Sequence, residues 1–106
     1  MSLPQTMRAA VITAPGGPDV LTLTERAIPH PGSGEILVRV RSSALNRADL
    51  HQRAGRYNAP PGVPPDIPGL EFAGEVAAVG PGASLWSPGD RVAGLVGGGA
   101  HAQYLV

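Results

Sequence analysis

The residues that could do chemistry gather in and around one short stretch of the chain, residues 46–57. An amide, a carboxylate, an imidazole and a phenol occur there, on Asn46, Asp49, His51 and Tyr57. A phenol is protonated at neutral pH, so Tyr57 can donate to an oxygen that gains negative charge. These residues also have purely structural interpretations. Asn46 and Asp49 suit a helix start, and Tyr57 suits a half-buried ring in a loop.

A short helix is predicted to begin after Asn46, which is a preferred N-cap residue. Asp49 lies at the third helical position, where it can answer the cap, and Leu45 and Leu50 take the positions of a hydrophobic staple. Gly55 is typical of a helix end. A proline-rich loop that contains Tyr57 follows, so we expect this helix and its loop to carry the function.

The rest of the chain is predicted to form short strands over residues 7–13, 20–26, 35–43, 69–80, 91–96 and 102–106. Isoleucine and valine alternate with arginine along 35–43, which is the pattern of a strand with two different faces. Proline and glycine inside Ser87–Asp90 favour a type II turn. The fold class is therefore mostly β, a small and partly open β-barrel with one short helix.

Composition excludes several classes of protein. The 106 residues suffice for one domain, and eight basic and eight acidic residues leave no formal net charge to attract nucleic acid or anionic lipid. The absence of cysteine rules out disulfides and thiolate metal sites. No apolar run approaches the roughly 20 residues that a membrane helix needs. We expect a cytoplasmic protein that binds neither nucleic acid nor a membrane.

Seven motifs follow one another in the order M-R-A-A-V, P-G-S-G-E-I-L-V-R-V, N-R-A-D-L, G-R-Y, G-L-E-F-A-G-E-V, V-G-P-G and P-G-D-R-V. Together they resemble the N-terminal catalytic domain of medium-chain dehydrogenase/reductases. The likeness is strongest to the zinc-free quinone oxidoreductases, the group of ζ-crystallin and the p53-inducible quinone oxidoreductase. It covers residues 7–106 and implies a GroES-like β-barrel.

This sequence differs from the zinc-dependent branch of that superfamily at the positions of the zinc ligands. Asn46 stands where those enzymes have a cysteine ligand, and Leu70 stands where they have a histidine ligand. Four further cysteines hold their structural zinc, and this chain has none. An amide and a leucine cannot replace thiolate and imidazole on Zn²⁺. We therefore expect no metal site.

The resemblance also implies roles for individual residues. Asn46 is expected to lie near the nicotinamide as a cofactor-binding residue, and Tyr57 is expected to be the catalytic donor to a quinone oxygen. Asp49 and Glu71 surround the metal in zinc-dependent relatives. Without metal, we expect both carboxylates to pair with nearby arginines, chosen from Arg47, Arg53 and Arg56.

The histidines and the second tyrosine carry less information. His51 matches a histidine of the proton relay in zinc alcohol dehydrogenases, but a solvated histidine is the favoured interpretation here. His30 and His101 lie at predicted turns or strand ends and give no functional signal. Tyr104 falls inside a predicted strand, which favours a packing role.

No G-x-G-x-x-G fingerprint and no P-loop occur in the chain. In the family that it resembles, a separate Rossmann domain binds the dinucleotide. We therefore expect residues 1–106 to be the N-terminal catalytic-domain fragment of an NADPH-dependent, zinc-independent quinone oxidoreductase, inactive by itself and homo-oligomeric when intact. Its substrate is expected to be a quinone or another conjugated carbonyl.

Three alternatives remain open at this point. An enoyl reductase shares the fold, the cofactor and the lack of zinc, and differs in the shape of the pocket. A binding or regulatory protein could keep the barrel without turnover. A single-domain GroES-like protein is the third alternative.

Overall fold

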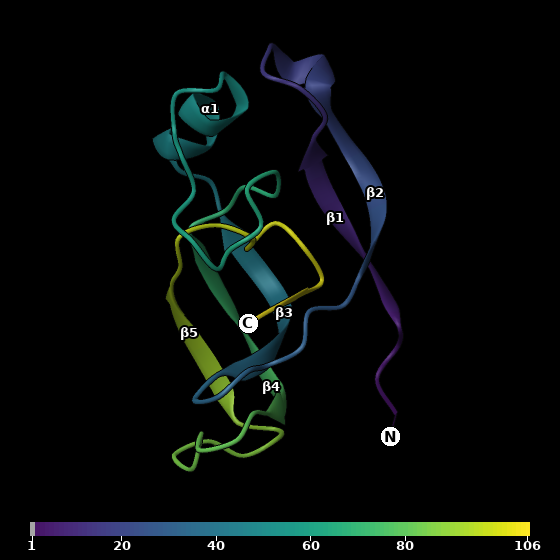
Figure 1. Ribbon diagram of the computed structural model, residues 1–106, viewed down its shortest axis with the longest axis vertical. Helices are drawn as coiled ribbons and strands as arrows, with labels where there is room; N and C mark the ends of the chain where they lie inside the picture. The colour runs from purple at the N-terminus through teal and green to yellow at the C-terminus, as the bar shows by residue number, and fades with distance from the viewer. Residues whose placement is uncertain (1) are drawn as a thin grey trace.

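Strands make up most of the regular structure in the computed structural model, which describes residues 2–106 (Figure 1). The strands are β1 (Thr6–Ile12), β2 (Leu21–Ala27), β3 (Ile36–Ala44), β4 (Glu71–Val79), β5 (Arg91–Leu95) and β6 (Tyr104–Leu105). The helices are α1 (Arg47–Arg53) and a single 3-10 turn, η1 (Pro18–Val20). All six predicted strands and the predicted helix are confirmed. The turn η1 was not predicted; Pro18 begins it, with the φ that suits a first helical position.

The strands form two antiparallel sheets, which gives the partly open barrel expected from the sequence. β1 and β2 form a two-stranded sheet, and the other sheet has the order β5-β4-β3-β6. A single bridge between Ala9 and Ala102 links the two sheets. Figure 1 shows the β1–β2 pair beside the larger sheet, with α1 at one end of the molecule.

β3 is an interior strand of the larger sheet, and both of its faces are covered near its start. Leu37 and Val38 are neighbours in sequence, each is 1% exposed, and they belong to two different hydrophobic clusters. Ile36 and Val40 pack with Val38, as the alternation predicted. The first cluster contains Met7, Ala9, Val11, Ile28, Leu37 and Ile67, and the second contains Val38, Ala100 and Leu105.

The pairing of β3 with β4 shifts by one residue near the end of β3. Val40 pairs with Gly74 and Ser42 pairs with Ala73, so Arg41 is an extra residue between them. An extra residue reverses which face the following side chains occupy. Ser43 therefore lies on the face of the sheet opposite to the one that strict alternation along β3 would give it.

α1 begins and ends as the sequence predicted. Asn46 is the N-cap with an extended backbone, and Asp49 completes a capping box. Gly55 follows the helix with φ +84°, a conformation that residues with side chains rarely adopt. The staple was predicted wrongly, because Leu45 and Leu50 are 88% and 52% exposed. Within the described residues, neither helix has the length and apolar character needed to cross a bilayer.

Candidate functional site

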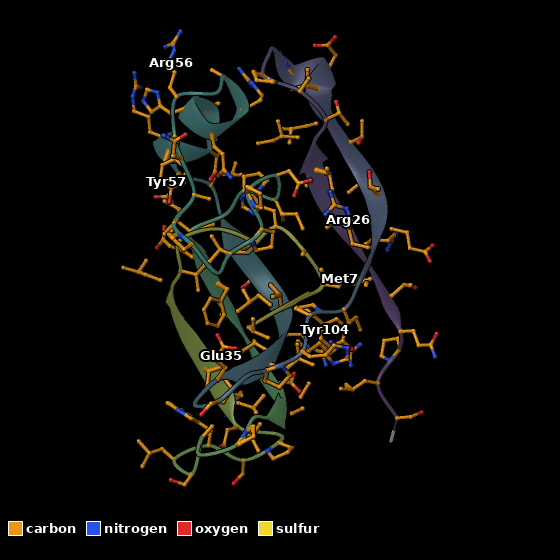
Figure 2. The ribbon with its side chains drawn as sticks, viewed as in Figure 1. Met7, Arg26, Glu35, Arg56, Tyr57 and Tyr104 are labelled. Atoms are coloured by element: carbon orange, nitrogen blue, oxygen red, sulfur yellow. The ribbon has the colours of Figure 1, made fainter. Side chains whose placement is uncertain are left out.

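Tyr57 lies in the loop after α1 and is half-buried. Its hydroxyl donates to the backbone carbonyl of Gly97 at 2.7 Å, across 40 residues of sequence. Figure 2 shows Tyr57 next to α1, well away from Tyr104, which lies close to Met7. Tyr104 packs against the first hydrophobic cluster, in agreement with its predicted packing role.

Asn46 joins the start of α1 to the start of β4. Its backbone N–H donates to Asp49 Oδ2 at 3.1 Å, and its side-chain Nδ2 donates to Glu71 Oε2 at 2.6 Å. All three residues are partly buried. The amide thus serves as a cap and as a partner of a carboxylate at the same time.

The predicted arginine partners of the two carboxylates are wrong. Glu71 accepts from Asn46, whereas Asp49 Oδ2 lies 2.9 Å from Nε2 of His101. Arg53 instead donates to the backbone carbonyl of Gly16 at 3.1 Å. Arg47 and Arg56 are exposed, and among residues 2–106 neither forms an ion pair with Asp49 or Glu71.

His101, which no sequence pattern singled out, lies at the centre of this site. The His101 and Asp49 side chains are 14% and 13% exposed. Ser43 Oγ lies 2.7 Å from Nδ1 of the same ring. Ser43, His101 and Asp49 therefore form a continuous hydrogen-bonded row, which we call the Ser–His–Asp row.

The segment Gly97–His101 contacts both Tyr57 and Asp49. Gly97 binds the Tyr57 hydroxyl, and the His101 side chain binds Asp49. Backbone hydrogen bonds fix this segment to the end of the proline-rich loop: Gly99 N to Ile67 O, His101 N to Pro68 O and Ala100 N to Gly69 O, at 2.7, 2.9 and 3.1 Å. The segment consequently positions Tyr57 and Asp49 together.

One hollow is lined by Ser43 and Glu71 of the site, and a second shares with the site only Gly98 and Gly99. The first, of about 230 Å³, is open to solvent and lined by Ser42, Ser43, Ala44, Glu71, Phe72 and Ala73. The second, a more apolar pocket of about 340 Å³, includes Met7, Arg26 and Tyr104, but neither Asn46 nor Tyr57 (Figure 2). Residues 2–106 contain no cluster of three or more histidine or acidic side chains arranged to hold a metal ion.

Comparison with known proteins places the fold in a family. The profile described as "Alcohol dehydrogenase GroES-like domain" matches residues 32–106. Synaptic vesicle membrane protein VAT-1 homolog-like of Mus musculus is 39% identical over 101 residues, which are 95% of this chain and 24% of that protein. Quinone oxidoreductase of Lama guanicoe is 39% identical over 103 residues, 94% of this chain and 31% of that protein.

The likeness extends to three dimensions. The crystal structure of the human VAT-1 homolog-like protein superposes with a TM-score of 0.85 at 38% identity, over 94% of this chain and 32% of that one. The chain thus spans about a quarter to a third of the length of these relatives. On the profile match and the superposition together, the chain belongs to the alcohol dehydrogenase GroES-like domain family, the N-terminal domain of medium-chain dehydrogenase/reductases.

Proposed function

We propose that the full-length protein containing this chain is an NADPH-dependent, zinc-independent quinone oxidoreductase, and that these residues form one wall of its active site. Its substrate class is a quinone or a related conjugated carbonyl. A relative named quinone oxidoreductase, 39% identical over 94% of this chain, supports the reaction class. The resemblance to zinc-free quinone oxidoreductases supports the choice of NADPH, and the hydrogen bond of Asn46 supports zinc independence.

The single observation that carries the proposal is the 2.6 Å hydrogen bond from Asn46 Nδ2 to Glu71 Oε2. Asn46 occupies the position of a cysteine ligand in the zinc-dependent branch. A zinc ion at this place would need a negatively charged or imidazole ligand at position 46, and it would need the Glu71 carboxylate to be free of other partners. The amide instead gives Glu71 a hydrogen, so the carboxylate is satisfied without a cation.

The residues present fit the nicotinamide end of a dinucleotide but not its phosphates. A carboxamide retains a second N–H and a second lone pair after one bond at each end, so Asn46 can still bind a ligand amide. Leu45, which is 88% exposed, and Leu50, which is 52% exposed, offer an apolar surface to a ring. When bound, the dinucleotide would supply the hydride. Its phosphates need a glycine-rich helix start that the described residues 2–106 do not contain.

Tyr57 is the proposed donor to the substrate oxygen. Its hydroxyl has one hydrogen, and that hydrogen is directed to Gly97. To donate to a substrate, the hydroxyl must rotate away from Gly97. Tyr57 therefore acts as a switchable hydrogen-bond donor that also anchors the loop between α1 and β4.

The test is NADPH oxidation by the purified full-length protein. We expect 1,4-quinones to be reduced with one NADPH consumed per quinone, with the same rate before and after treatment with a chelator. Enones and enoyl thioesters run in parallel would identify an enoyl reductase. No oxidation with any acceptor, or loss of rate on chelation, would overturn the proposal.

A pair of substitutions isolates the contribution of Asn46. Serine is also a good N-cap residue but cannot reach Glu71 with an amide, whereas alanine loses both functions. We expect Asn46→Ser to raise the KM for NADPH several-fold with little change in stability. Asn46→Ala should raise KM similarly and also cost about 1 kcal/mol of stability. Equal KM values for Asn46→Ser and the wild type would remove Asn46 from the cofactor site.

A further inference from the structure

We propose that the Ser–His–Asp row is a proton-transfer chain that carries a proton from solvent to the start of α1. The inference rests on the proposed function, because reduction of a quinone requires one proton in addition to a hydride. It assigns His101 and Ser43 a part in proton supply. It also makes Asp49 the inner end of the chain.

The three side chains run from solvent to the interior. Ser43 is exposed and lines the open hollow beside β3 and β4. His101 and Asp49 are 14% and 13% exposed, so both are largely shielded from solvent. The two links measure 2.7 Å and 2.9 Å, which are ordinary hydrogen-bond lengths. A proton can thus move from water to Asp49 in two short transfers.

The acceptor end fixes the direction of the hydrogen bonds. An ionised carboxylate only accepts, so Nε2 of His101 carries the hydrogen that binds Asp49. In a neutral ring Nδ1 is then the acceptor, and the Ser43 hydroxyl donates to it. Imidazole exchanges protons near neutral pH, which makes it the usual carrier in such chains. Every link therefore points inward.

Asp49 provides an outlet. Oδ2 accepts both from His101 and from the backbone of Asn46, whereas Oδ1 is buried and has no hydrogen-bond partner among residues 2–106. Buried polar atoms are nearly always satisfied in folded proteins. The position that Oδ1 occupies is enclosed by protein, and we place there the passing of the proton to a substrate group that reaches it in the full-length protein.

One turnover moves one proton along the whole row. Addition of a hydride converts the quinone carbonyl into an oxyanion, which takes one proton from Asp49 once rotation of the carboxyl group has brought the protonated Oδ2 to the position that Oδ1 held. Asp49 has received that proton at Oδ2 from Nε2 of His101, and Nδ1 has taken one from Ser43, which regains its own from water. Exchange with water then returns the ring hydrogen from Nδ1 to Nε2. The net result is one proton taken from solvent and one given to the oxyanion.

Other groups near α1 fit this task less well. Tyr57 can donate a hydrogen bond to the substrate, but among residues 2–106 its hydroxyl bonds only to the Gly97 carbonyl, which has no proton to replace one that is lost. The side chain of His51 makes no hydrogen bond with any described residue from 2 to 106, although it lies on the same helix as Asp49. Among these side chains of residues 2–106, His101 alone touches both an exposed hydroxyl and a largely shielded carboxylate.

Nitrogen NMR of the full-length protein, labelled at histidine, gives a readout that does not depend on activity. The His101 ring should be protonated at Nε2, and Ser43→Ala should shift the Nδ1 signal with little effect on Nε2. His101→Gln assigns the signals by their loss. A ring protonated at Nδ1 alone overturns the chain, because Nε2 then has no hydrogen for Asp49.

Chemical rescue separates proton transfer from packing. His101→Ala should lower quinone turnover by about a hundredfold, the lower end of what positioned proton transfer contributes. Added imidazole should recover at least a tenth of the wild-type rate, since a free base can occupy the vacated space. Ser43→Ala should lower turnover by several-fold, and Ser43→Thr, which keeps the hydroxyl, should not.

The matched control is His30→Ala, because His30 is exposed and outside the row. Its turnover should equal that of the wild type with and without imidazole. Turnover of His101→Ala within twofold of wild type, or a loss that imidazole does not reverse, overturns the inference while the proposed function stands. A wild-type protein that reduces no quinone overturns both.

Discussion

Gly69→Ala should destabilise the protein strongly, because an added methyl group there meets both an unfavourable backbone conformation and the backbone of His101. Gly69 has φ +112° and precedes the start of β4 by two residues. A Cβ there would lie 2.6 Å from the backbone nitrogen of His101 and 2.9 Å from Cβ of Ala100. The first contact is with backbone, and that nitrogen is already bonded to Pro68 O at 2.9 Å, so it cannot simply rotate away.

The loss of stability expected for Gly69→Ala has two contributions, which a control variant can separate. Positive φ in a residue with a side chain costs roughly 1–3 kcal/mol, and overpacking adds roughly 1–3 kcal/mol. We therefore expect Gly69→Ala to cost about 4 kcal/mol. Gly62 has φ +94° and open space around the position that an added methyl group would take, so Gly62→Ala should cost only the first part, roughly 1–3 kcal/mol.

Urea unfolding followed by circular dichroism measures both variants against the wild type. The slopes should agree, so that midpoints report stability. The Gly69→Ala variant should also lose the Ser–His–Asp row, because the methyl group displaces the backbone of His101. Free energies of unfolding within about 0.5 kcal/mol of each other for the two variants would refute the steric argument.

Three further outcomes are expected. Tyr57→Phe should lower quinone turnover of the full-length protein about tenfold and stability by about 1 kcal/mol, with NADPH affinity unchanged; unchanged turnover would make Tyr57 a pocket wall only. The Arg41 hydrogen bond, and then the charges of Arg41, Arg39 and Arg91, lower the pKa of Glu75 below its usual 4.5. The ionised Glu75 side chain therefore stabilises the folded state above pH 4.5, and this stabilisation is lost as the pH falls through the lowered pKa. Glu75→Gln should accordingly lose stability relative to the wild type above pH 4.5 and converge with it in acid or high salt, and a gap that persists in acid would contradict this. Metal analysis of the chelator-washed full-length protein should find no zinc bound through this chain, and stoichiometric zinc lost on mutation of Glu71 would contradict the proposed subfamily.

The local features of the fold could be predicted from the sequence because their causes are local. Asn46 and Asp49 specify the start of α1 through atoms three residues apart, and Gly55 specifies its end. Apolar alternation predicted β3, and the turn before β5 is closed by a hydrogen bond from Asp90 N to Ser87 O at 3.1 Å. Each of these depends on neighbours in the chain.

The site could not be predicted in the same way because its contacts join distant residues. Tyr57 meets Gly97 across 40 residues, Asp49 meets His101 across 52 and Ser43 meets His101 across 58. Residue type and spacing indicate which groups can bond, but they do not select a partner on another strand. For this reason the arginines near α1 were the wrong choice, and a histidine without a sequence signal became central.

The proposed proton chain depends on the extra residue in β3, Arg41, and so on the exact length of that strand. Ser43 reaches His101 because Arg41 is left out of the pairing with β4, which changes the face that Ser43 occupies. Loss of one residue from this strand would turn the hydroxyl to the opposite side while every functional side chain was retained. Insertions and deletions, more than substitutions, should therefore decide which members of the family have such a chain. A search of relatives for the serine and the histidine alone would miss that distinction unless it also counted the residues between Val40 and Ser43.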